Sequence, residues 1–143
     1  RMSEIQAALG IAQMKRLDEI LYDRRSTAKI YLERLTEFDN VIVPLSTSAE
    51  QCTFQSFVIL LEEGTDRSAV IRYMKEQGIE TTLGTYSMHA HQAFSRFGYE
   101  PGNLQNSWFN QKYSLTLPLL PNMKEETIDR IIIALKDALK TVK

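Results

Sequence analysis

Several residue types that define whole classes of protein are scarce in this sequence. Its 143 residues contain a single cysteine, Cys52, so an internal disulfide is excluded, which fits the reducing environment of the cytoplasm. The two histidines and the cysteine do not show the paired spacing of a zinc site. The few glycines form neither a dinucleotide-binding fingerprint nor a phosphate-binding loop. Disulfide scaffolds, zinc domains and glycine-loop nucleotide binders are therefore not indicated.

The sequence also has no excess of charge of one sign and no long apolar run. Lysine and arginine total 17 while aspartate and glutamate total 18, and the formal net charge of −1 gives no electrostatic reason to bind nucleic acid or an anionic membrane. No apolar run approaches the roughly 18 residues that suggest a membrane span, and no segment resembles a signal peptide. We therefore expect neither a nucleic-acid partner nor a membrane partner.

The remaining composition is that of an ordinary globular domain. Hydrophobic residues make up 43% of the chain and charged residues 24%. The length predicts one domain, residues 1–143, that is large enough to bury a core of its own.

The N-terminal segment is predicted to be a long helix. Apolar residues recur at helical spacing from Ser3 to about Phe38, and Ser3 with Gln6 matches a capping box. Because this segment is longer than most globular helices, it is expected to bend or to consist of two helices end to end.

The rest of the chain alternates strands and helices. Residues 54–62 are rich in aromatic and β-branched types, which favours a strand, and Gly78 stands where a left-handed residue ends a helix. The aromatic residues Trp108, Phe109 and Tyr113 are expected to anchor a short helix to the sheet. The expected strands are 41–43, 54–62, 79–86 and 113–121. The expected helices are one capped by Thr65 or Asp66 that runs through Met74, 91–97, a short one from Asn106 or Ser107, and 124–142. This order predicts an α+β fold, in which a small, mainly antiparallel sheet is covered by helices.

A run of small residues, Ala7, Ala8 and Gly10, lies inside the first predicted helix. A glycine inside a helix costs about 1 kcal/mol relative to alanine, so its presence needs a reason. Either the turn is exposed and tolerates glycine, or another backbone or a ligand approaches more closely than a side chain would permit. The sequence leaves both alternatives open.

The candidate chemistry of the sequence lies in residues 85–94, TYSMHAHQAF. His89 and His91 would share a face on a strand but diverge on a helix, and no third metal ligand lies nearby, so we predict no metal site. One interpretation is a pair of histidines on a surface loop. The other is that Tyr86 and His89 form a polar lip that faces a ligand, because binding residues concentrate on loops of rigid scaffolds.

Four separated motifs resemble one family. The stretches RMSEIQAALGIAQMKRLDEI, TFQSFVILL, GIETTLGTYSMHAHQAF and YSLTLPLLPNMKEETIDRIIIALK are similar, in this order, to the C-terminal region of the DegT/StrS family of pyridoxal-phosphate-dependent sugar aminotransferases. The resemblance covers essentially the whole chain. It implies the C-terminal small domain of a fold-type-I aminotransferase, with the N-terminal cofactor domain missing from this chain.

The resemblance also implies roles for particular residues. Arg1 matches the family arginine beside the asparagine that reaches the cofactor phosphate of the partner subunit. His89 matches the family histidine near the substrate, with His91 as an alternative, although only Ser87 and Met88 separate Tyr86 from His89, where many members have a longer loop. No lysine of the chain stands in the context of the family's Schiff-base lysine, so no catalytic residue is expected here.

The implied activity is transfer of an amino group, from glutamate, to a keto sugar that is linked to a nucleotide. The cofactor is pyridoxal 5′-phosphate, which acts as the electron sink, and the implied assembly is a homodimer containing both domains. The fragment alone is expected to be inactive. Two alternatives stay open from the sequence: a sugar dehydratase or regulator of the same family, and a free-standing α+β interaction module.

Overall fold

A computed structural model describes residues 2–43, 51–100 and 102–142 of the chain. Its centre is a four-stranded antiparallel sheet with the order β1-β2-β4-β3, in which β1 is Val41–Ile42, β2 is Phe57–Leu61, β3 is Thr82–Leu83 and β4 is Ser114–Leu117. The register pairs Val41 with Leu61, Phe57 with Leu117 and Thr82 with Thr116. This confirms the predicted α+β class and the antiparallel sheet.

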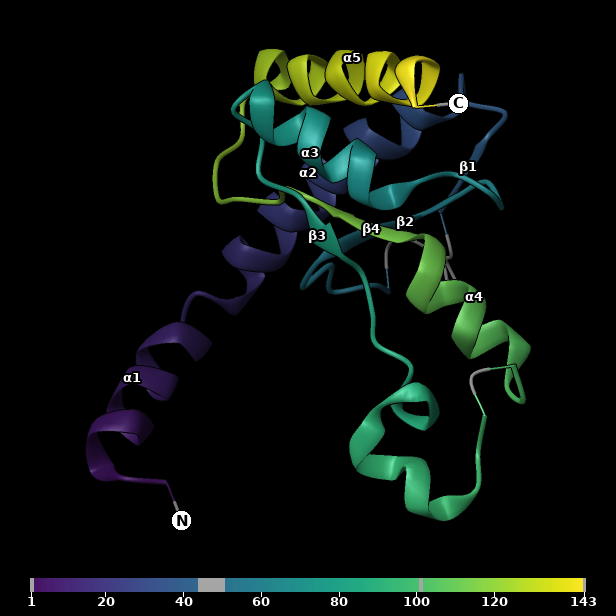
Figure 1. The fold of residues 1–143 in the computed structure, drawn as a ribbon. Coiled ribbons are helices and arrows are strands. Elements are labelled where there is room, and N and C mark those ends of the chain that lie inside the picture. The colour runs from purple at the N-terminus through teal and green to yellow at the C-terminus, as the bar shows by residue number, and fades with distance from the viewer. Residues whose placement is uncertain (1, 44–50, 101, 143) are drawn as a thin grey trace.

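Helices cover one face of the sheet (Figure 1). The helix α5, Glu125–Thr141, packs against both α2, Leu17–Leu35, and α3, Arg67–Glu76. The helical spacing of apolar residues in 124–142 predicts five inward positions, and all five are buried: Ile128, Ile131, Ile132, Leu135 and Leu139.

The core lies between these helices and alternate residues of the two central strands. The buried residues are Phe57, Ile59 and Leu61 of β2 and Leu115 and Leu117 of β4. They alternate along each strand because successive side chains of a strand point to opposite faces of the sheet. Burial of each large apolar side chain contributes roughly 1.5–3 kcal/mol, so these central strands and α5 supply much of the stability.

The predicted long N-terminal helix is two helices end to end. α1, Glu4–Met14, begins at the expected capping box, with the Gln6 N–H donating to Ser3 Oγ at 3.3 Å and the Ser3 N–H to Gln6 Oε1 at 2.9 Å. The chain leaves helical geometry at Arg16, where φ is −108°. α2 then ends at Leu35, a turn before the predicted Phe38.

The turn after α3 confirms the role predicted for Gly78. Asp66 caps the start of α3 by accepting from the Ala69 N–H at 3.1 Å. Gly78 has φ +71°, and the Ile79 N–H donates back to the Met74 carbonyl at 2.9 Å. This pattern closes a helix C-terminus through a left-handed residue.

All four strands are shorter than predicted, and β1 ends at Ile42, one residue before its predicted end. Phe54 has φ +44°, which interrupts extended backbone before β2 begins at Phe57. α4, Gln105–Tyr113, continues through Tyr113, so β4 begins one residue later. β3 is reduced to two residues, and the N–H of the next residue, Gly84, donates both to the Ser114 carbonyl and to Ser114 Oγ, each at 3.2 Å.

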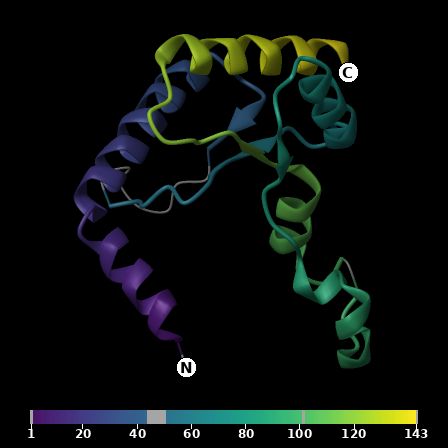
Figure 2. The same ribbon diagram turned by 90° about the vertical axis from the view of Figure 1, so that its left-hand side faces the viewer.

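The sheet and the helices α2, α3 and α5 form a layered body. Two parts of the chain extend from this body in the same direction, away from α5 (Figures 1 and 2). One is α1, which buries none of its residues. Its Gly10 has no atom within 4 Å of the position a Cβ would occupy, so no close approach comes from the described chain itself. The other is the segment between β3 and β4. Among the described residues, no helix is long and apolar enough to cross a membrane.

Tyr31 joins α2 to the sheet. It is fully buried, its ring stacks on Phe57 with 4.8 Å between centroids, and its hydroxyl donates to the Pro118 carbonyl at 2.8 Å. Burial raises the pKa of the Tyr31 phenol, so the hydroxyl stays protonated and remains a donor.

We expect Tyr31→Phe to lower the free energy of unfolding by about 1 kcal/mol, because the Pro118 carbonyl loses its donor while ring packing is kept. Urea denaturation of this chain measures the change. The matched control is Tyr22→Phe on the same helix, where the side chain is 76% exposed and no change is expected. Equal midpoints for the two variants would contradict the stabilising role of this hydrogen bond.

Candidate functional site

Two of the predicted site residues, Tyr86 and His89, lie on one excursion from the sheet, residues 85–113, which we call the arm. It contains the short 3₁₀ helices η1, Met88–Ala90, and η2, Gln92–Phe97, and then α4. Because Leu83 of β3 pairs with Leu115 of β4, the arm must leave and rejoin the sheet at the same place. The position of every residue on the arm therefore depends on this base.

Ser114 and Gly84 form the base of the arm. The buried Ser114 Oγ accepts from the N–H groups of Gly84 at 3.2 Å and Thr85 at 3.1 Å. A Cβ on Gly84 would lie 2.5 Å from Val58 Cγ1 and 2.8 Å from Ser114 Cβ. Glycine is therefore required here by close packing.

Arg67 binds the C-terminal end of the arm through hydrogen bonds. Its Nη1 donates to the carbonyl of Gln111 and, at 3.2 Å, to that of Ser114, at the C-terminus of α4, where a positive charge is favourable. Burial lowers the pKa of the Arg67 guanidinium, and the nearby Tyr86 phenol opposes that shift. This contact between α3 and α4 was not foreseen, because it joins residues far apart in the sequence.

The structure separates Tyr86 from His89. The Tyr86 side chain is 72% exposed, whereas His89 is only 7% exposed. His89 Nδ1 lies 2.7 Å from Ser87 Oγ, which is buried as well.

His91 takes a different position from His89. It is exposed, and its Nδ1 accepts from the Ala93 N–H at 3.2 Å, which caps η2. The two histidines thus diverge, as expected for a helix rather than a strand. In the described part of the chain, no three side chains of the types His, Cys, Asp or Glu are grouped to hold a metal ion.

Ser87 is the centre of a polar network that sequence reasoning missed. Its N–H donates to Gln111 Oε1 at 2.6 Å, and its Oγ lies 2.9 Å from Ser107 Oγ as well as against His89. Ser87 itself is 1% exposed. Ser107 and Gln111 lie on one side of α4, because they are four residues apart in a helix. This spacing was the one sign in the sequence that the two side chains could act together.

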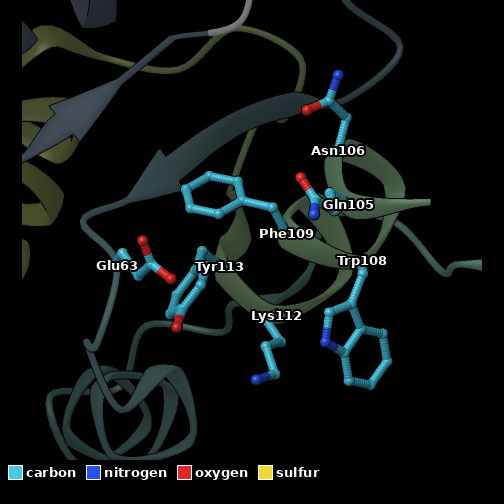
Figure 3. A pocket seen from close by; sticks show the side chains of 7 residues that line it. All are labelled: Glu63, Gln105, Asn106, Trp108, Phe109, Lys112 and Tyr113. Atoms are coloured by element: carbon cyan, nitrogen blue, oxygen red, sulfur yellow. The ribbon is translucent and has the colours of Figure 1, made fainter. Parts of the chain in front are cut away.

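A separate hollow of about 360 Å³ lies on the other side of α4 (Figure 3). The rings of Phe109 and Tyr113 are 4.8 Å apart, and Lys112 Nζ is 5.3 Å from the Trp108 ring. Of the three predicted aromatic anchors, Tyr113 packs against the core, whereas Trp108 points away from the sheet beside Lys112. The residues lining this hollow are Glu63, Gln105, Asn106, Trp108, Phe109, Lys112 and Tyr113.

Both extended segments carry exposed apolar side chains. On α1, Ile5 is 83% exposed and Leu9 is 62% exposed, and on the arm Phe97 is 57% exposed. Surfaces of this kind mark interfaces when they are contiguous. Arg1 lies outside the described residues, so its predicted role stays a prediction.

Comparison with known proteins gives one consistent result. Residues 1–136 match the model of the DegT/DnrJ/EryC1/StrS aminotransferase family. The spore coat polysaccharide biosynthesis protein SpsC of Bacillus subtilis (strain 168) is 30% identical over 97% of this chain and 37% of its own length. The chain spans only 36–37% of the length of the curated relatives that it matches.

Solved structures show the same fold. A DegT DnrJ EryC1 StrS aminotransferase from Brucella abortus matches with a TM-score of 0.79 and 25% identity, over 96% of this chain and 36% of that chain. The PLP form of Spr1654 from Streptococcus pneumoniae matches with a TM-score of 0.90 and 19% identity, over 100% of this chain and 37% of that chain. With the family match over nearly its whole length, this chain belongs to the DegT/DnrJ/EryC1/StrS aminotransferase family.

Proposed function

We propose that residues 1–143 are the C-terminal small domain of a larger pyridoxal-phosphate-dependent aminotransferase. In this proposal the complete protein transfers an amino group from glutamate to a keto sugar that is linked to a nucleotide. The observation that carries it is the family match over residues 1–136 of a chain that spans about 37% of SpsC. The name of SpsC, which refers to polysaccharide biosynthesis, supports a sugar as the acceptor.

The described residues do not fit a covalent site for the cofactor. The cofactor is an aldehyde that enzymes hold through a desolvated lysine amine, but every lysine in the described ranges is exposed. The cofactor is therefore assigned to the rest of the complete protein, and this chain supplies residues on the substrate side. Arg1, implied by resemblance to lie beside the cofactor phosphate, belongs to the same proposal.

On the substrate side, the arm exposes Tyr86 and buries His89. The phenol of Tyr86 is exposed and can donate to or accept from a sugar hydroxyl. His89 is fixed by Ser87, so its ring has one orientation relative to the arm. We assign both side chains to the wall that orients the sugar, with no proton transfer ascribed to either.

The exposed face of α1 is assigned to the interface with the rest of the complete protein, which we propose is a cytoplasmic homodimer. α1 buries nothing within this chain, although Ile5, Leu9 and Ile11 are large and apolar. A single exposed helix of this kind is marginal in water, so it gains stability chiefly from packing. The open space at Gly10 allows a neighbouring backbone to approach closely.

The proposed activity is tested with the complete protein. Purified with pyridoxal phosphate, it should form more than one equivalent of 2-oxoglutarate from glutamate only when a nucleotide-linked keto sugar is present, and the sugar should gain an amino group detectable by mass spectrometry. This chain alone, assayed in parallel, should do neither. Loss of water from the sugar without use of glutamate would instead support the dehydratase alternative.

We expect His89→Gln in the complete protein to lower sugar turnover by about tenfold or more, equivalent to about 1.4 kcal/mol at the transition state. His91→Gln is the matched control, because His91 is exposed and its ring accepts from the Ala93 N–H of the adjacent η2. Thermal unfolding of both variants separates folding from function. A large drop in melting temperature with normal turnover would assign His89 a structural role alone.

A further inference from the structure

The side chain of Tyr86 is exposed, but the backbone on both sides of it is held by hydrogen bonds. The Thr85 N–H donates to Ser114 Oγ at 3.1 Å, and the Ser87 N–H donates to Gln111 Oε1 at 2.6 Å. Ser114 and Ser87 are both 1% exposed, which limits the access of water to these bonds. The place of Tyr86 relative to the sheet is therefore set by two side chains, those of Ser114 and Gln111.

Arg67 of α3 binds the backbone of both of these residues. Its Nη1 donates to the Gln111 carbonyl and, at 3.2 Å, to the Ser114 carbonyl. A charged donor bonds more strongly than a neutral one, and the last carbonyls of a helix lack partners within it. One guanidinium nitrogen thus holds the two residues whose side chains hold Thr85 and Ser87.

Gln111 depends on Arg67 more than Ser114 does. Ser114 belongs to β4, where it pairs with Leu60 of β2, and its carbonyl also accepts from the Gly84 N–H at 3.2 Å. Gln111 lies in the last turn of α4, and helix ends fray readily. Loss of the guanidinium is therefore expected to release Gln111, and with it the backbone after Tyr86, more than the backbone before it.

We propose that Arg67 is a positioning residue for Tyr86, on which it acts through Gln111 and Ser87. In this role Arg67 needs no contact with a substrate, because it fixes the backbone from which the Tyr86 phenol projects. The action of the phenol on a sugar rests on the proposed function, whereas the dependence of the Tyr86 backbone on Arg67 does not.

Amide hydrogen exchange of this chain, followed residue by residue with NMR, measures the dependence. In Arg67→Met, which keeps a long side chain but no donor, we expect the Ser87 amide to exchange about tenfold faster and the Thr85 amide to change less. Arg72→Met on the same helix is the matched control, because Arg72 is exposed, and it should change neither rate. An unchanged Ser87 rate in Arg67→Met overturns the proposal.

A second variant keeps the experiment decisive if Arg67→Met lowers the stability of the whole chain. Gln111→Met removes the Oε1 acceptor but keeps the carbonyl that Arg67 binds. It should speed exchange at Ser87 and leave the amide of the buried Ile59, in the middle of β2, unchanged. Equal acceleration at Ser87 and Ile59 in both variants marks a general loss of stability and overturns the proposal.

Steady-state kinetics of the complete protein separate the positioning role from a structural one. Arg67→Met and Tyr86→Phe should each raise KM for the nucleotide-linked keto sugar about fivefold with little change in kcat, because a contact kept throughout the reaction contributes to binding alone. The double variant should raise KM no further, since both changes act on one contact, whereas independent effects that multiply overturn the proposal. If exchange changes as expected and the complete protein shows no aminotransferase activity, the proposed function fails and the inference about the Tyr86 backbone stands.

Discussion

The antiparallel pairing of β3 with β4 is the constraint on which the rest of the structure depends. It brings the two ends of the arm together at Gly84 and Ser114, where a side-chain oxygen accepts two backbone N–H groups and leaves no room for a Cβ. Arg67 then fastens the C-terminal end of α4 to this base. Both ends of the arm are therefore bonded to the sheet. Because its ends are fixed in this way, the arm is not a free loop, and the polar network around Ser87 can keep a defined geometry.

Much of the layered body could be predicted from the sequence, because local patterns determine it. The period of the terminal helix predicted its buried positions, and Gly78 predicted the turn after α3, since a left-handed residue leaves a local signature. The arm could not be predicted in the same way. The contacts that hold Ser87, the partner of His89, join residues 20 to 24 positions apart, and the helical spacing of Ser107 and Gln111 does not show that they meet Ser87. The predicted length of β3 was wrong as well: β3 ends at Leu83, and the next two N–H groups, of Gly84 and Thr85, donate to the hydroxyl of Ser114, which is distant in the sequence.

The molecule divides into a well-packed body and two segments with few partners. The sheet, α2, α3 and α5 bury a continuous core, whereas α1 buries nothing and the arm exposes Tyr86 and Phe97. Both segments extend in the same direction from the body (Figure 2). Helical periodicity predicted α1 but not the exposure of its apolar side, because periodicity alone does not tell which partner covers a helix. We infer that the two segments together form the surface through which this domain meets the rest of a complete aminotransferase.

The central claim, that α1 is covered in the complete protein, is tested most directly by hydroxyl-radical footprinting with mass spectrometry. The oxidation rates of Ile5 and Leu9 are compared between this chain and the complete protein, with Ile133 of α5, which is 61% exposed, as the internal reference. The account predicts strong protection of Ile5 and Leu9 in the complete protein and no change at Ile133. Equal oxidation of Ile5 and Leu9 in the two proteins would contradict it.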